Sequence, residues 1–127
     1  MHSYNYMRSI KYPNAAPLSQ EQLDRVRDVE HPLIRQHPVT GRRALYVGAH
    51  AGHIVDWPEP IGKALLYELT WRADQPEYKM SHAWREGDVI VWDNRAVLHR
   101  ATYYDAVKHK RLMQRTTIGG DELTVPQ

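Results

Sequence analysis

Short apolar runs separated by turn residues recur along this chain, and this pattern limits it to folds that are rich in antiparallel strands. Two such runs, 33–37 and 44–48, flank a proline and a glycine within 38–41, which predicts a β-hairpin. Apolar and polar residues alternate from 77 to 84, and a glycine-containing turn leads into the apolar run 89–92, which predicts a second hairpin.

One long stretch has helical periodicity instead. Leucine and isoleucine recur every four residues within 59–73, so we expect a helix there that packs one face against a sheet. A shorter helix is expected from a capping box at Ser19 through Val29. The fold class that follows is mainly β with one packed helix, an α+β arrangement.

Composition excludes several classes of function. The 127 residues fit one domain, and the absence of cysteine excludes disulfide frameworks and thiolate metal sites. A net charge of +2 is too small to indicate nucleic-acid binding, although Lys108 to Arg111 form a local basic run. No basic segment followed by an apolar one opens the chain, and no apolar run approaches the ~20 residues of a membrane span. We therefore expect a cytoplasmic protein that binds neither nucleic acid nor membranes.

The residues that suggest chemistry lie near the end of the chain. His99 follows an apolar strand, and a neutral imidazole in such a place is a common ligand of ferrous iron. Arg111 and Arg115 fall on one face of a strand expected over 111–118, with Cα atoms roughly 13 Å apart. Guanidinium groups bind carboxylates bidentately, so the two arginines could hold an elongated dianion. The alternative is a structural or solvated role for each of the three.

For other residues the surrounding sequence gives weaker support for a functional role. His50 and His53 have a spacing that permits a shared metal, but they lie on a glycine-containing loop and are better candidates for lining a pocket. Asp93 could cap a turn. Trp84 and Trp92 lie on adjacent expected strands, so we expect them to pair in the core.

Four phrases then carry a family resemblance. They are Leu-Tyr-Val-Gly-Ala-His at 45–50, Trp-Arg-Glu-Gly-Asp at 84–88, the Trp-Asp-Asn-Arg phrase of 92–95 that leads to Leu-His-Arg-Ala at 98–101, and Arg-Leu-Met-Gln-Arg at 111–115. From residue 31 to 121 the chain resembles the C-terminal half of the taurine and aryloxyalkanoate dioxygenases, the TauD/TfdA family, which depend on Fe(II) and 2-oxoglutarate. The histidine loop at 48–53 favours the aryloxyalkanoate branch.

The resemblance implies a fold and a domain organisation. It implies part of a double-stranded β-helix, a jelly-roll or cupin-like barrel, without the N-terminal strands. Residues 1–30 would form a connecting segment with a short helix, 31–121 the C-terminal part of the barrel, and 122–127 a tail. Family members are expected to be about twice as long as this chain.

The resemblance also implies roles for individual residues. His99 would be the C-terminal histidine ligand of Fe(II), Arg111 would hold the far carboxylate of the cosubstrate 2-oxoglutarate, and Arg115 would lie near its other end or near the anionic group of the substrate. His50 and His53 would line the substrate side of the cavity. The implied reaction is hydroxylation of a small anionic substrate that resembles taurine or an aryloxyalkanoate.

One element of the family pattern is absent. The family takes its first two metal ligands from a His-x-Asp or His-x-Glu motif, and none of the eight histidines begins such a triplet. The chain is therefore expected to be incomplete alone and to pair with a second copy or with a complementary N-terminal half. Two alternatives are a non-catalytic module that binds organic acids and a self-assembling remnant of the fold.

Overall fold

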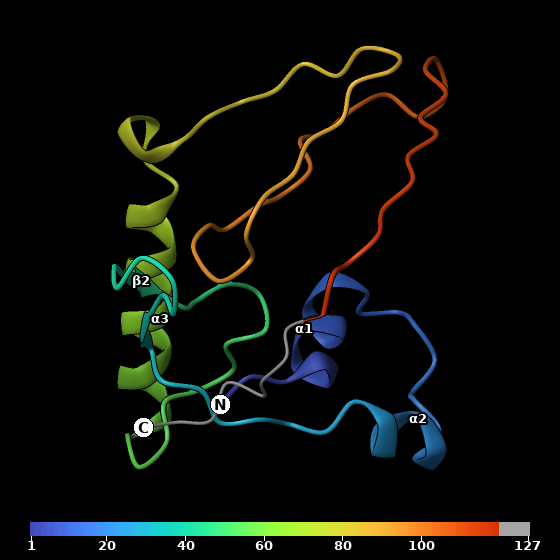
Figure 1. Cartoon of the computed structure of the whole chain (residues 1–127). Coiled ribbons are helices and arrows are strands. Elements are labelled where there is room, and N and C mark those ends of the chain that lie inside the picture. Colours follow the sequence, from blue (N-terminus) through green and yellow to red (C-terminus); the bar gives the residue numbers. More distant parts are fainter. Residues whose placement is uncertain (120–127) are drawn as a thin grey trace.

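The computed structural model describes residues 1–119 of the chain (Figure 1). Its elements, in chain order, are α1 (Tyr4–Lys11), α2 (Gln20–Arg25), β1 (Ile34–Gln36), β2 (Arg43–Leu45), α3 (Glu59–Ala73) and the 3-10 helix η1 (Pro76–Tyr78). From residue 79 to 119 the described chain forms neither helix nor strand.

The first predicted hairpin is confirmed, with shorter strands than expected. β1 and β2 pair antiparallel, with Arg35 opposite Ala44. The turn is closed by His37, whose N–H donates to the Arg42 carbonyl at 2.8 Å and whose carbonyl accepts from the Gly41 N–H at 2.9 Å. Gly41 has a φ of 67°, a conformation that costs glycine little. The hairpin thus follows from its turn residues.

The capping box predicted at Ser19 is also confirmed. The Ser19 hydroxyl accepts from the Gln22 N–H at 3.3 Å, and the Gln22 side chain accepts from the Ser19 N–H at 3.0 Å. The helix ends at Arg25 rather than at Val29. Every residue of this short helix remains at least partly exposed, so little packing is available to extend it.

Helix α1 departs from the sequence prediction, in which the segment 1–30 only connects and contains one later helix. It begins after Ser3, whose hydroxyl accepts from the Tyr6 N–H at 3.1 Å. The residues before it form isolated antiparallel bridges, in which His2 pairs with Val29 and with Ala51. The start of the chain therefore lies between two segments that are distant in sequence.

Helix α3 forms over the predicted range 59–73. Its buried residues are Gly62 and Leu66, which lie one turn apart on the same face. A Cβ on Gly62 would lie 3.4 Å from the main-chain nitrogen of Ile54, so glycine permits a close approach there. The helix thus packs against the segment that precedes it.

The strands predicted over 77–84, 89–92 and 111–118 do not form in the described part of the chain. The turn between the first two does form: the Asp88 N–H donates to the Arg85 carbonyl at 3.1 Å, and Gly87 has a φ of 88°. A strand needs a neighbour for its N–H and C=O groups, and these segments have no paired neighbour. Within residues 1–119 only β1 and β2 form strands, so the mainly β structure that the sequence predicts is present there only in part.

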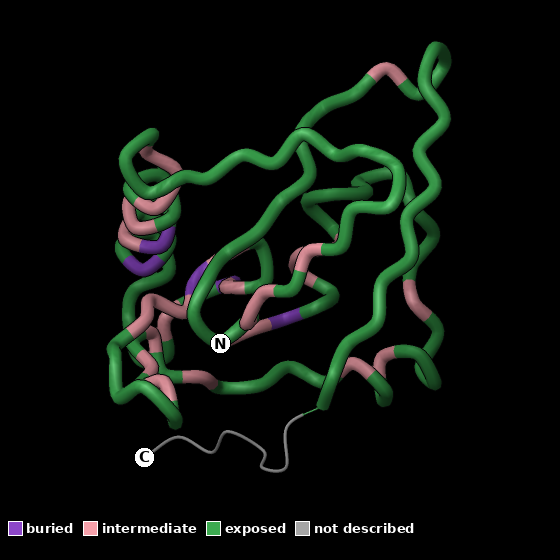
Figure 2. Tube along the Cα trace, turned by 45° about the horizontal axis from the view of Figure 1, so that its top comes forward, coloured by how far each residue is buried: buried purple, intermediate pink, exposed green. Residues whose placement is uncertain are grey.

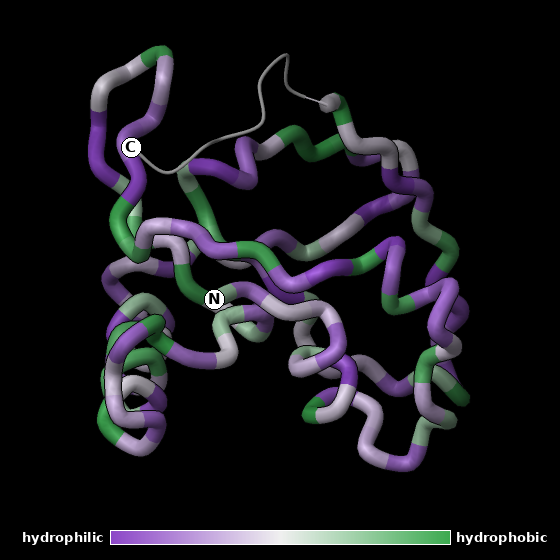
Figure 3. The backbone as a smooth tube through the Cα atoms, turned by 90° about the horizontal axis from the view of Figure 1, so that it is seen from below, coloured by the Kyte–Doolittle hydropathy of each residue, from purple (hydrophilic) through white to green (hydrophobic). Residues whose placement is uncertain are grey.

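The core is small for a chain of this size. Val47 and Leu66 are the only buried hydrophobic residues among positions 1–119, and exposed residues dominate the trace (Figure 2). Hydrophobic residues are distributed along residues 1–119 rather than gathered in one centre (Figure 3). The accessible surface is 11559 Å², whereas a compact monomer of this mass would expose about 7000 Å². Much apolar surface thus remains uncovered.

No helix within residues 1–119 has both the length and the apolar character that crossing a membrane requires.

Candidate functional site

The loop that carries His99 is organised by its own aromatic and polar side chains. The indole N–H of Trp92 donates to the Asn94 side chain at 2.8 Å. The ring of Trp92 lies 4.9 Å from the ring of His99, centre to centre, and His99 is exposed. The predicted pairing of Trp84 with Trp92 is wrong, since no ring contact joins them within residues 1–119; the ring of Trp84 instead lies 5.0 Å from the ring of His82, centre to centre.

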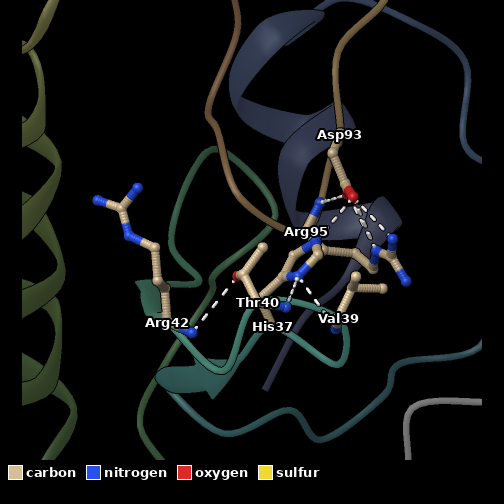
Figure 4. A network of polar contacts seen from close by, with 6 residues as sticks. All are labelled: His37, Val39, Thr40, Arg42, Asp93 and Arg95. Carbon is tan, nitrogen blue, oxygen red and sulfur yellow. Dashed lines mark hydrogen bonds and ion pairs between the residues drawn. The ribbon is translucent and has the colours of Figure 1, made fainter.

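Asp93 is the centre of a polar network in the same loop (Figure 4). Its carboxylate accepts from the Arg95 side chain at 2.7 Å and from the Arg95 N–H at 2.8 Å, which confirms that Asp93 caps a turn. It also interacts with Nε2 of His37 at 2.9 Å. Hydrogen bonds from Arg95 and then from His37 hold the pKa of Asp93 well below its usual range. Asp93 is therefore ionised at neutral pH.

A second ion pair attaches the other end of this loop. The guanidinium of Arg100 lies 3.0 Å from both carboxylate oxygens of Asp74, the residue that follows α3. Both side chains are largely solvent-exposed, so the pair contributes modestly to stability. Its geometric effect is to place the residue after His99 beside the end of the helix.

The two candidate arginines lie on extended chain rather than on a strand. The Arg111 guanidinium lies 5.5 Å from the centre of the Tyr104 ring, and both Arg111 and Arg115 are exposed. Within residues 1–119, neither arginine forms an ion pair. No hydrogen bond or ring contact links them to His99 in that part of the chain. The strand face predicted to carry them is absent, and their joint role stays a prediction.

His50 and His53 lie in the loop before α3. The main-chain carbonyl of His50 accepts from the Ser3 N–H at 2.8 Å, and the carbonyl of His53 accepts from the amino group of Met1 at 3.0 Å. His53 also lines a cavity of about 260 Å³. The other lining residues are Met1, His2, Glu30, His31, Pro32, Leu33, Tyr46, Ala51, Ile54, Val55 and Leu66. His53 thus lines this cavity and His50 does not, and the substrate role of both stays a prediction.

The described residues do not complete a metal site. No group of three histidine, aspartate or glutamate side chains in positions 1–119 could hold an ion together. A ferrous site of the expected kind needs two histidines and one carboxylate. Iron therefore does not fit the described residues alone, and a complete centre would need ligands from outside residues 1–119.

Comparison with known proteins decides the family. Residues 1–117 match the family described as "Taurine catabolism dioxygenase TauD, TfdA family". The chain belongs to the TauD/TfdA dioxygenase family. This confirms the resemblance, and the match includes residues 1–30, which the resemblance did not cover.

Individual relatives in the TauD/TfdA family support this membership. The alpha-ketoglutarate-dependent 2,4-dichlorophenoxyacetate dioxygenase of Burkholderia sp. (strain RASC) is 44% identical over 101 residues, which are 80% of this chain and 34% of that protein. A candidate alpha-ketoglutarate dependent 2,4-D dioxygenase from Burkholderia xenovorans has a solved structure that is 42% identical, with a TM-score of 0.67 over 75% of this chain and 37% of its own. AAD-2, solved in complex with Mn(II) and N-oxalylglycine, is 36% identical, with a TM-score of 0.66 over 75% of this chain and 36% of its own.

The chain thus shares the fold of TauD/TfdA dioxygenases over three quarters of its length. Its matched part spans about a third of the length of these relatives.

Sequence reasoning missed two groups of residues that the structure brings together. His37 is predicted only as a strand end, because no local pattern indicates a partner 56 positions later. His2, His31 and Tyr46 form an aromatic cluster beside the cavity: the His2 ring stacks on Tyr46 at 4.8 Å, and His31 meets both rings edge-on. These contacts depend on where the start of the chain lies in the fold, which no short-range signal reveals.

The aromatic cluster predicts a pH dependence of stability. Nε2 of His2 donates to the Tyr46 carbonyl at 3.2 Å, and burial, followed by the nearby His31, lowers the pKa of His2 to about 4. Between this value and the unfolded value near 6.5, the unfolded chain binds more protons, so stability falls as the pH falls. Because the ring is only half-buried, solvent screening reduces the loss between pH 7 and pH 5 to about 1 kcal/mol.

Urea unfolding at the two pH values measures this loss. His2→Gln keeps an N–H donor for the Tyr46 carbonyl but does not titrate, so its stability should change less between the same pH values. An equal loss in both proteins would assign the pH dependence to other groups, such as His31, whose pKa is also lowered by burial.

Proposed function

We propose that this chain supplies the C-terminal part of an Fe(II)- and 2-oxoglutarate-dependent dioxygenase that hydroxylates a small anionic substrate. The observation that supports this most directly is the 44% identity to a 2,4-dichlorophenoxyacetate dioxygenase over 101 residues. That relative favours an aryloxyalkanoate rather than taurine as the substrate class.

In this proposal each candidate residue keeps the role that the resemblance implied. His99 donates an imidazole nitrogen to the metal, Arg111 binds the far carboxylate of 2-oxoglutarate, and Arg115 binds near its other end or near the anionic group of the substrate. His50 and His53 line the substrate side. Fe(II) supplies the oxidation chemistry, while the protein contributes binding, orientation and charge. The two missing ligands come from residues beyond those described.

The exposed surface supports a need for further polypeptide. Val89, Val91, Leu112 and Ile118 are each at least 85% exposed, on segments that the sequence predicted as strands. Unpaired, apolar, extended segments favour association with other strands. We infer that a complementary N-terminal part of the barrel covers them. Pairing with a second copy is the alternative, and light scattering of the purified chain tests it.

A non-catalytic role in binding organic acids is the second candidate. It is favoured by one observation, namely that the described residues hold no three-ligand metal group although both arginines are exposed. Binding of 2-oxoglutarate that is indifferent to Fe(II) would support this role, whereas iron-dependent binding would support the dioxygenase.

Succinate formation is the decisive measurement. The chain is joined to the N-terminal part of the Burkholderia sp. relative that it does not match, and the fused protein is given Fe(II), 2-oxoglutarate and 2,4-dichlorophenoxyacetate. We expect iron-dependent succinate from the fused protein and none from the chain alone. A folded fused protein that produces no succinate would contradict the proposal. Succinate formation by the chain alone would contradict the proposal that the chain is incomplete.

Arg111→Leu should weaken the binding of 2-oxoglutarate by the fused protein about thirtyfold, or about 2 kcal/mol, because a bidentate, charge-assisted pair is lost. Calorimetric titration measures the affinity. Arg27→Leu removes the same charge from another exposed position and should leave the affinity within about twofold. Equal effects of the two substitutions would show that net charge, rather than a contact at Arg111, governs binding.

A further inference from the structure

We propose that His37 and Asp93 are positioning residues, which together hold the loop that carries His99 against the β1–β2 hairpin. The inference rests on the role proposed for His99, but its contacts are independent of that role. His37 begins the turn between β1 and β2, and Asp93 lies 56 positions later in the chain (Figure 4). Their hydrogen bond is a direct side-chain link between the hairpin and this loop.

The hairpin turn determines which nitrogen of His37 faces Asp93. Nδ1 of His37 accepts from the main-chain N–H groups of Val39 at 3.3 Å and Thr40 at 3.2 Å. A nitrogen that accepts two N–H groups carries no proton, so a neutral ring holds its proton on Nε2. Nε2 then donates to the Asp93 carboxylate at 2.9 Å. The His37 side chain is only 10% exposed, so the ring is fixed on both sides.

Asp93 also fixes the main chain of the residues that precede His99. Its main-chain carbonyl accepts from the N–H groups of Ala96 at 3.0 Å and Val97 at 3.1 Å, which makes the turn that leads to His99. The next residue, Leu98, places a methyl carbon 3.9 Å from where a Cβ on Gly48 would lie, just beyond β2. The loop is thus linked to the hairpin by one polar contact, and Leu98 also lies near Gly48, three residues after β2 ends.

The far side of His99 has its own attachment, because Arg100 pairs with Asp74 at the end of α3. His99 therefore lies between two anchors that belong to different parts of the fold. The His37 anchor is the less exposed of the two, and its acceptor is ionised, which strengthens the hydrogen bond. Loss of the hydrogen bond between His37 and Asp93 leaves the turn held by Arg95, but it removes the polar link between this turn and the hairpin.

Two substitutions at His37 separate positioning of the loop from stabilisation of the turn. In His37→Asn the side-chain oxygen occupies the place of Nδ1 and can still accept from Val39 and Thr40, but no donor reaches Asp93. In His37→Gln the amide nitrogen reaches the place of Nε2 and can still donate to Asp93. A role confined to the turn would make asparagine the better replacement, whereas a positioning role makes glutamine the better one.

The readout is nuclear Overhauser contact between the Leu98 methyl groups and Gly48 in the full chain, with urea unfolding to compare stabilities. We expect this contact to be lost in His37→Asn and retained in His37→Gln. Retention in both variants, or loss only in the glutamine variant, would overturn the proposal. No metal or substrate is involved, so the result is independent of whether the fused protein produces succinate.

The wild-type chain provides a test if the variants fail to fold. Nitrogen-15 shifts of the His37 ring distinguish a proton on Nε2 from one on Nδ1. A proton on Nε2, together with the contact between Leu98 and Gly48, supports the proposal. A proton on Nδ1 would overturn it, because Nε2 of a neutral ring could not then donate to Asp93.

Discussion

Replacing His99 by alanine in the fused protein should lower iron-dependent succinate formation by more than about 100-fold. Substitution of residues that merely support a metal ligand costs about 10- to 100-fold in metal affinity or activity, so loss of a ligand should cost more. His99 is exposed, and its replacement should therefore change the free energy of unfolding by less than about 0.5 kcal/mol. The loss of turnover can then be assigned to the site rather than to unfolding.

His109→Ala is the matched control for this result. His109 is another exposed histidine ten positions later, and no site role is proposed for it. Turnover should remain within about twofold of the unsubstituted fused protein, as is usual for surface changes away from special features. Comparable losses in the two variants, or substantial turnover without His99, would exclude His99 as a metal ligand.

Replacing Leu66 by alanine should lower the free energy of unfolding of the chain by about 2 to 3 kcal/mol. Leu66 is 7% exposed and is one of two buried hydrophobic residues in the described chain. It also lines the cavity of about 260 Å³, so truncation enlarges a space that already exists. The expected loss lies at the low end for leucine truncation because the cavity opens to solvent. Urea unfolding followed by circular dichroism measures the change.

Ile61 provides the comparison for Leu66 on the same helix. It is 57% exposed, so Ile61→Ala should cost less than about 1 kcal/mol. If both variants lose the same stability, the packing of α3 does not depend on its buried face.

Local features were predictable because their causes are local. The hairpin follows from a proline and a glycine between two apolar runs, and α3 follows from a four-residue periodicity that the structure reproduces over 59–73. The start of α2 follows from the reciprocal hydrogen bonds of Ser19 and Gln22. Its end was predicted too late in the chain, because the end of a helix depends on packing as well as on propensity.

Features that depend on a distant partner were not predictable in this way. The alternation over 111–118 identifies a segment suited to a sheet, but a strand forms only where another strand pairs with it, and none does in the described chain. The bridges of His2 depend on segments near positions 29 and 51, which no local pattern indicates. Helix α1 does have a local signal, the cap at Ser3, which the sequence prediction did not use. The candidate site shows the same division. His99, Arg111 and Arg115 are identified from their residue types and from the family phrases, whereas their positions relative to one another depend on the tertiary structure.

The sequence by itself determined the family, the hairpin, the starts of two helices and the identity of the candidate site residues, because each rests on neighbouring residues or on a recognisable phrase. Only the tertiary structure decided which side chains meet. The contact of His37 with Asp93, and the stacking of His2 on Tyr46, arise because folding brings together groups that are 56 and 44 positions apart. Chain folding, rather than sequence spacing, sets such distances.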